Sequence, residues 1–105
     1  LELESAVHKL TDVPARLYGL KDRGRIEEGW WADLVVFDAQ NVAPDEIEVR
    51  EDLPGGGWRL YSEAIGVHHV FINGEQAVED GAFTEARPGT LLRSGRDTEK
   101  ITANG

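Results

Sequence analysis

Three histidines could do the most chemistry in this chain of 105 residues, because imidazole nitrogens bind divalent metals and transfer protons near neutral pH. His68 and His69 are neighbours on a predicted strand, so their side chains should point to opposite faces of a sheet. Two ligands of one metal need the spacing i, i+2 on a strand, or i, i+3 or i+4 on a helix. His8 lies far away in the sequence, on a predicted helix. We therefore expect no metal ligand among these histidines.

Other reactive residue types also lack the context that catalysis needs. Clustered carboxylates could act as general acid and base, but here they lie in polar segments and should be solvated: Glu27, Glu28, Glu46, Glu48, Glu51 and Asp52. Ser62 and Ser94 are outside any Gly-x-Ser-x-Gly elbow. The run Gly55-Gly56-Gly57 is not followed by the Lys and Ser/Thr of a phosphate-binding loop. The sequence predicts no catalytic, cofactor-binding or metal-binding residue.

The charge balance excludes several classes of partner. Twenty acidic and 11 basic residues give a formal net charge of −9, which disfavours nucleic acids and anionic membranes. No apolar run approaches the roughly 20 residues of a membrane-spanning helix. The chain has no cysteine, so it forms neither disulfides nor cysteine-based zinc sites, and we expect a cytoplasmic protein.

The first twenty residues should be helical. Apolar residues at i, i+4 and i+7 predict one helix over residues 3–10. Asp12 should cap a second short helix, with Pro14 in its first turn and Gly19 just after its end.

The central part of the chain predicts a strand and a loop. Leu34–Phe37 is fully apolar, so both of its faces should be covered. Residues 41–51 are ambiguous, although Ile47 and Val49 alternate with charged residues as in a half-buried strand. Residues 53–57 should form a loop, because three successive glycines lose too much entropy in regular structure.

Tight turns organise the later strands. Val67–Ile72 should be a strand that ends in Asn73-Gly74, the dipeptide most typical of a type I′ hairpin. Residues 75–78 would return as its partner. Asp80-Gly81 marks a second turn, and residues 82–84 a last short strand. The sequence therefore predicts a mostly β fold with an N-terminal helical segment.

Three stretches together resemble the C-terminal region of the amidohydrolase superfamily. Residues 20–38 match a G-x-I-x-x-G-x-x-A-D-L-V-V-F-D signature through Gly24, Ile26, Gly29, Ala32, Asp33 and the segment 34–38. Residues 70–74 are similar to its V-x-V-N-G hairpin, and residues 11–20 to the T-x-x-P-A-x-x-x-G-L helix that ends the catalytic barrel. Residues 81–84 and 86–89 resemble most the N-acyl-D-amino-acid deacylase (D-aminoacylase) branch.

The resemblance implies a fold and a set of missing parts. Residues 1–20 would be the end of the catalytic barrel, residues 21–93 the C-terminal portion of a composite β-sandwich, and residues 94–105 a flexible tail. The metal ligands of such enzymes lie upstream, at the ends of barrel strands. Zinc or another divalent metal is therefore expected in the full-length parent and not in this chain.

These features predict a non-catalytic C-terminal fragment with a structural and domain-interface role, inactive on its own. The chain starts Leu1-Glu2-Leu3-Glu4, without an initiator methionine, which favours a piece of a longer protein. Its partners would be the remainder of the parent chain and, for the isolated fragment, further copies of itself. The aromatic residues should close a core or an interface: Trp30, Trp31, Trp58 and Tyr61. The alternatives are a free-standing β module that self-associates or binds a partner, and a hydantoinase-like or dihydroorotase-like branch.

Overall fold

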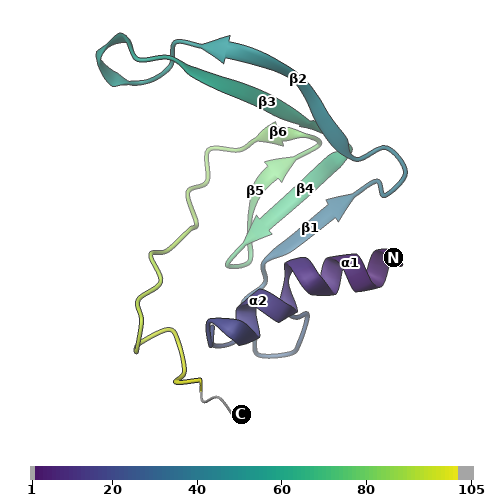
Figure 1. Ribbon diagram of the computed structural model, residues 1–105, viewed down its shortest axis with the longest axis vertical. Coiled ribbons are helices and arrows are strands. Elements are labelled where there is room, and N and C mark those ends of the chain that lie inside the picture. Colours follow the sequence, from purple (N-terminus) through teal and green to yellow (C-terminus); the bar gives the residue numbers. More distant parts are fainter. Residues whose placement is uncertain (1, 102–105) are drawn as a thin grey trace.

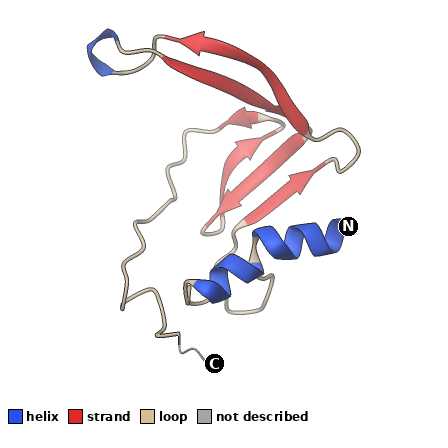
Figure 2. Ribbon diagram, in the orientation of Figure 1, coloured by secondary structure: helices blue, strands red, loops and turns tan. Residues whose placement is uncertain are grey.

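The computed structural model describes residues 2–101 and consists of short helices followed by antiparallel strands (Figures 1 and 2). The helices are α1 (Leu3–Leu10) and α2 (Asp12–Leu17), and a 3₁₀ turn η1 covers Pro54–Gly56. The strands are β1 (Leu34–Phe37), β2 (Ala43–Arg50), β3 (Arg59–Ile65), β4 (Val67–Ile72), β5 (Glu75–Glu79) and β6 (Ala82–Phe83). The predicted class, mostly β with an N-terminal helical segment, is confirmed.

The strands form two separate units. One is a four-stranded sheet in the order β1-β4-β5-β6, with antiparallel pairing throughout. The other is a two-stranded hairpin of β2 and β3. The hairpin lies at the opposite end of the molecule from α1 and α2, with the four-stranded sheet between them (Figure 1).

Two turns of the sheet have the geometry that their sequence predicts. Asn73 and Gly74 have φ angles of 51° and 81°, so both central residues of the β4–β5 turn are left-handed, as a type I′ turn requires. Asp80 and Gly81 repeat the pattern between β5 and β6, at 49° and 81°. The predicted strands on either side of these turns are confirmed.

The start of α2 differs from the prediction. Asp12 is the first residue of the helix and not its cap, and the capping position, Thr11, makes no side-chain capping bond. The Thr11 hydroxyl donates to the carbonyl of Val7 instead, at 2.7 Å. The carboxylate of Asp12 is engaged elsewhere, by the guanidinium of Arg25. Gly19 does end the helical segment in the left-handed conformation, with φ of 68°.

Two strands are more exposed than the sequence predicts. Val35 and Val36 of β1 are 55% and 48% exposed, although a fully apolar strand was expected to be covered on both faces. Ile47 and Val49 of β2, expected to be half-buried, are 73% and 62% exposed. Strand β3, which the sequence did not predict, pairs with β2 and leaves its apolar residues equally uncovered.

The described chain forms almost no core of its own. Among residues 2–101, Ala15 is the one hydrophobic residue that is buried. The accessible surface is 8461 Å², roughly 2,600 Å² more than a compact protein of this mass exposes. The radius of gyration is 16.5 Å, against about 13 Å for a compact domain of this length.

The segment after β6 runs along the side of the sheet and reaches α2 (Figure 1). Within this segment, Thr98 forms an antiparallel bridge with Leu20, and the flexibility expected for residues 94–105 stays a prediction. The amide of Lys21 donates to the carbonyl of Asp97 at 3.0 Å, and the amide of Glu99 to the carbonyl of Gly19 at 2.7 Å. The last four residues of that segment, 102–105, lie outside the described part. No helix within residues 2–101 is long and apolar enough to span a membrane.

Candidate interface and polar clusters

Two histidines are neighbours on β4 and the third lies on α1. His68 and His69 are adjacent on β4, and Nδ1 of His69 lies 2.9 Å from the amide nitrogen of Gln76. Its Nε2 is 3.8 Å from a carboxylate oxygen of Asp80. His8 lies on α1, 3.7 Å from Asp12. No group of three or more His, Cys, Asp or Glu side chains able to hold a metal occurs in the described part of the chain.

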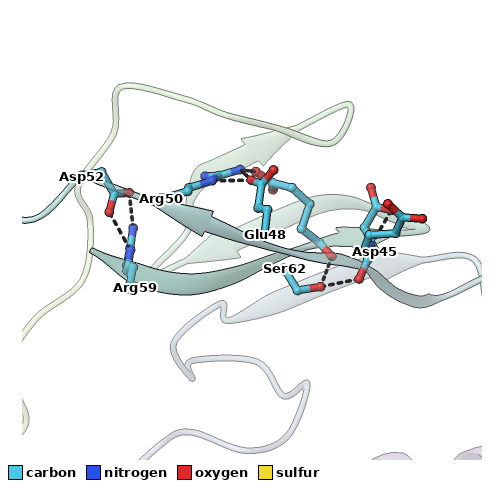
Figure 3. A network of polar contacts seen from close by, with 8 residues as sticks. Asp45, Glu48, Arg50, Asp52, Arg59 and Ser62 are labelled. Carbon is cyan, nitrogen blue, oxygen red and sulfur yellow. Dashed lines mark hydrogen bonds and ion pairs between the residues drawn. The ribbon is translucent and has the colours of Figure 1, made fainter. Parts of the chain in front are cut away.

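The acidic residues of the hairpin pair with two arginines. Figure 3 shows Arg50 beside Glu48, and Arg59 beside Asp52. Arg59 donates two hydrogen bonds to the Asp52 carboxylate, at 2.9 and 2.7 Å, and this bidentate contact lowers the pKa of Asp52. The guanidinium groups of Arg50 and Arg59 lie 3.9 and 4.9 Å from the centre of the Tyr61 ring. The cluster is exposed to solvent, so it contributes little to the stability of the hairpin and offers no protected acid–base pair.

A second cluster joins α2 to the turn that follows it. Asp12 is only 7% exposed, and its Oδ1 accepts a 2.7 Å hydrogen bond from Nε of Arg25. Nε of Arg16 lies 3.2 Å from the same oxygen. The hydrogen bond from Arg25 is the main reason that the pKa of Asp12 is lowered. A Cβ on Gly24 would lie 2.5 Å from Cβ of Ala15, so this close approach needs glycine.

A third cluster links two of the signature stretches, residues 20–38 and residues 70–74. Asp33 accepts a hydrogen bond from the backbone N–H of Asn73 at 2.9 Å and an ion pair from Arg23 at 2.5 Å. Arg23 also donates to the side-chain oxygen of Asn73, at 2.7 Å. The backbone N–H that Asp33 binds belongs to a residue forty positions away. A polar pair at that separation has no local signal, so the sequence did not reveal the cluster.

Apolar side chains gather at three places on the surface. The helical patch consists of Leu10, Val13 and Leu17, which are 79%, 44% and 66% exposed. The sheet patch is Val35 and Val36 on the edge strand β1. Val35 and Val36 are consecutive on the strand, so β1 exposes an apolar side chain on each of its faces. Large exposed apolar side chains of this kind are available for contact with another protein surface.

The third place, the hairpin patch, is Ile47, Val49 and Leu60. Val49 and Leu60 are cross-strand partners, and Ile47 is two residues before Val49, so all three share one face. Tyr61 lies on the other face and lines an open groove of about 670 Å³ with Phe83 of β6. The hairpin patch therefore faces away from the four-stranded sheet.

Two tryptophans lie next to arginine guanidinium groups. Trp30 lies under the guanidinium of Arg16 at 5.3 Å, and Trp31 under that of Arg23 at 5.2 Å. Trp31 is 53% exposed, and Trp58 at the hairpin end is 63% exposed. Exposed tryptophan beside arginine is typical of the centre of a protein interface.

The sequence profile of the Amidohydrolase family matches residues 1–78, which include both helices, the signature turn and most of the four-stranded sheet. The chain belongs to the amidohydrolase family. The resemblance carried by residues 11–38 and 70–74 is thereby confirmed.

Curated relatives of this amidohydrolase chain include three enzymes of Alcaligenes xylosoxydans xylosoxydans. N-acyl-D-glutamate deacylase is 44% identical over 93 residues, which is 89% of this chain and 17% of the relative. N-acyl-D-aspartate deacylase is 40% identical over 101 residues, covering 90% of this chain and 17% of the relative. D-aminoacylase is 37% identical over 90 residues, covering 86% of this chain and 17% of the relative.

The chain thus spans about a sixth of the length of these curated relatives. Dihydroorotases match at lower identity, between 28% and 31%. No solved structure matches the chain. The predicted likeness to the D-aminoacylase branch is confirmed.

Amidohydrolases are generally metal-dependent, and a metal centre needs several donor groups close together. The nearest pairs, His8 with Asp12 and His69 with Asp80, bring together two donor groups each. Asp12 is already bound by Arg25, and Asp80 is exposed. The described residues do not fit a catalytic metal site, and no catalytic step is derived from them.

Proposed function

We propose that this chain is the non-catalytic C-terminal part of a longer, metal-dependent deacylase of N-acyl-D-amino acids. Its role is to support the catalytic body of the parent by packing against it. The observation that carries this proposal is the missing core: the chain exposes roughly 2,600 Å² more surface than a compact protein of its mass. That excess exceeds the roughly 800 Å² that each partner buries in a standard interface.

The exposed apolar patches support different packing partners for the helical segment and for the sheet. The helical patch is the face with which residues 1–20, as the end of the catalytic barrel, would pack against neighbouring barrel helices. The sheet patch lies on β1, whose outer backbone edge is free and whose side chains are apolar on both faces. Residues 21–93 would complete a β-sandwich with strands from elsewhere in the parent, which would pair with this edge and cover both faces.

The chemistry would belong to the remainder of the parent. There, zinc or another divalent metal would activate the water that cleaves the N-acyl bond. The relatives whose names specify N-acyl-D-glutamate and N-acyl-D-aspartate support an acidic D-amino acid as the product. The lower identity of the dihydroorotases supports the deacylase branch over theirs.

A second candidate function is that of a free-standing module that associates with copies of itself. The free edge of β1 and the hairpin patch are the observations that favour it. Both candidate functions follow from the exposed apolar surface of the chain. They differ in whether the rest of a longer protein or another copy of the chain covers that surface.

Complementation in trans separates the two. The parent truncated before this segment should be inactive, and co-expression with the 105-residue chain should restore deacylase activity on N-acyl-D-glutamate and co-purification of the two pieces. A truncated parent that is fully active alone, or a chain that forms a discrete homo-oligomer and ignores the truncated parent, would favour the free-standing module.

A further inference from the structure

The segment from Thr84 to Glu99 crosses the molecule from one end of the sheet to the helices (Figure 1). At its start, the amide of Thr84 donates to the carbonyl of Ala77 at 2.9 Å, and its hydroxyl donates to the carbonyl of Gln76 at 2.7 Å. These two bonds fix the segment to β5, directly after the last strand. We refer to residues 84–99 as the strap.

Its middle is held by the β4–β5 turn. The side-chain N–H of Asn73 donates to the carbonyl of Pro88 at 2.7 Å. The same Asn73 donates its backbone N–H to Asp33 and accepts from Arg23. Asn73 therefore ties the strap to the first strand of the sheet and to the turn that follows α2.

The end of the strap is folded on itself before it meets the helices. The carboxylate of Asp97 accepts from the backbone N–H of Arg93 at 2.7 Å, and its own amide donates to the carbonyl of Arg93 at 2.9 Å. The amide of Gly95 donates to the hydroxyl of Thr98, at 2.9 Å. This local turn presents residues 97–99 in the extended form that pairs with residues 19–21.

The helical side of this contact is shaped to receive the strap. Gly19 has φ of 68°, and a Cβ at this position would lie 2.3 Å from the carbonyl oxygen of Glu99. Glycine at position 19 thus serves both the end of α2 and the close approach of another backbone. The contact with the strap therefore constrains the residue at the end of α2.

We propose that the strap is a built-in clasp that fixes the helical segment, residues 2–20, in one orientation relative to the four-stranded sheet. Without it, the two parts are joined by residues 21–33 alone, through the contacts of Arg23 and Arg25. The strap adds a second connection that starts at the far edge strand, β6, and closes on Leu20. If the proposed function holds, the clasp also fixes the last barrel helix against the sandwich.

Two glycine variants provide a matched test. Gly19→Ala places a methyl group against the strap, whereas a Cβ on Gly29, which has φ of 82°, meets nothing within 4 Å. Both variants impose the same left-handed strain on alanine, so their difference reports the clash with the strap. Hydrogen exchange is followed at the Lys21 amide, whose acceptor is the carbonyl of Asp97.

We expect Gly19→Ala to speed exchange of the Lys21 amide about ten-fold or more, because local opening replaces a paired amide with a free one. Gly29→Ala should leave that amide protected, and amides of β4 and β5 should stay protected in both variants. Equal exchange at Lys21 in the two variants would overturn the proposal.

A second pair of variants changes the strap and leaves α2 unaltered. It tests the proposal even if Gly19→Ala disturbs α2 itself. Glu99→Pro removes the N–H that donates to Gly19, and Lys100→Pro changes a neighbouring residue whose amide makes no backbone bond in the described structure. Spin labels on α1 and on the β4–β5 turn should show a broadened distance distribution for Glu99→Pro and the wild-type distribution for Lys100→Pro. An unchanged distribution for Glu99→Pro would also overturn the proposal. Both experiments use the 105-residue chain, so neither outcome depends on deacylase activity.

Discussion

The junction between the helices and the four-stranded sheet contrasts with the β2–β3 hairpin. At the junction, partly buried side chains such as Asp12 and Asn73 bind groups from distant parts of the chain. In the hairpin, exposed ion pairs such as Arg59 with Asp52 connect the ends of the same two strands. An isolated two-stranded hairpin is marginally stable in water, so this one needs a cover that the described chain does not supply.

The junction is held by contacts within the chain, whereas the hairpin requires a partner surface to cover it. Several signature residues of the family lie at the junction, among them Gly24, Asp33 and Asn73, and they make close contacts there. The apolar residues of the hairpin make no such contacts and form a surface suited to a partner. Variants in the two regions should therefore affect different measurements.

The largest effect is expected at Asn73, the residue that connects most segments. Asn73→Ala should lower the free energy of unfolding by about 2–4 kcal/mol, through lost hydrogen bonds and a left-handed φ that alanine tolerates poorly. Asn73→Gly keeps the backbone conformation and should cost about 1–3 kcal/mol, from the side-chain bonds alone. Urea titration of the chain measures the free energy of unfolding of both variants. If both variants were as stable as the wild type, Asn73 would not stabilise the junction.

The next effect is expected at Asp12 and depends on pH. Because Arg25 lowers the pKa of Asp12 in the folded chain, this carboxylate stabilises the fold above its ordinary value of 3.8. That contribution should disappear as pH falls from about 4 through the lowered pKa. Asp12→Asn should lower the midpoint of thermal unfolding at pH 7, and the difference from the wild type should shrink as pH falls below the ordinary value and through the lowered pKa of Asp12. A midpoint difference that is constant between pH 7 and pH 3 would contradict the role given to the Arg25 contact.

A smaller effect on stability, but a clear one on association, is expected in the hairpin patch. Val49→Asp places a charge among exposed apolar residues, so it should weaken self-association of the isolated chain several-fold and hardly change its unfolding midpoint. Thr90→Asp adds the same charge outside the patch and serves as control. Sedimentation over a range of concentrations measures the association, and a wild-type chain that stays monomeric would rule out the self-association proposed for the fragment.

The smallest effect is expected at the ion pairs of the hairpin. Asp52→Asn should leave the midpoint of thermal unfolding within a degree or so of the wild type, since exposed pairs contribute little. High salt should likewise change it little. A large drop in the midpoint would show that the hairpin is held by this cluster and not by a partner.

Local signals in the sequence predicted part of this arrangement. The Asn73-Gly74 and Asp80-Gly81 turns follow from the tolerance of these residues for positive φ. Strand β1 follows from its apolar run. Strand β3 escaped prediction because Ser62 and Glu63 interrupt its apolar alternation.

Contacts between distant residues could not be predicted in the same way. Asp12 has the residue type of a helix cap, but it is the first residue of α2, and an arginine thirteen positions away binds its carboxylate. The strap is polar and lacks the apolar spacing of a strand, so its pairing with Leu20 depends on the shape of the glycine at position 19. The absence of a candidate catalytic site among the histidines was argued from strand geometry and stays a prediction for the whole chain.

The central claim is that catalysis resides in the remainder of a longer protein and that this chain supports it. The most direct test measures bound metal and the hydrolysis of N-acyl-D-glutamate and N-acyl-D-aspartate, for the 105-residue chain and for its full-length parent side by side. We expect stoichiometric bound metal and hydrolysis of these substrates for the parent, and neither for the chain alone. Stoichiometric metal and turnover in the chain alone would contradict it and would return His8, His68 and His69 to the centre of the problem.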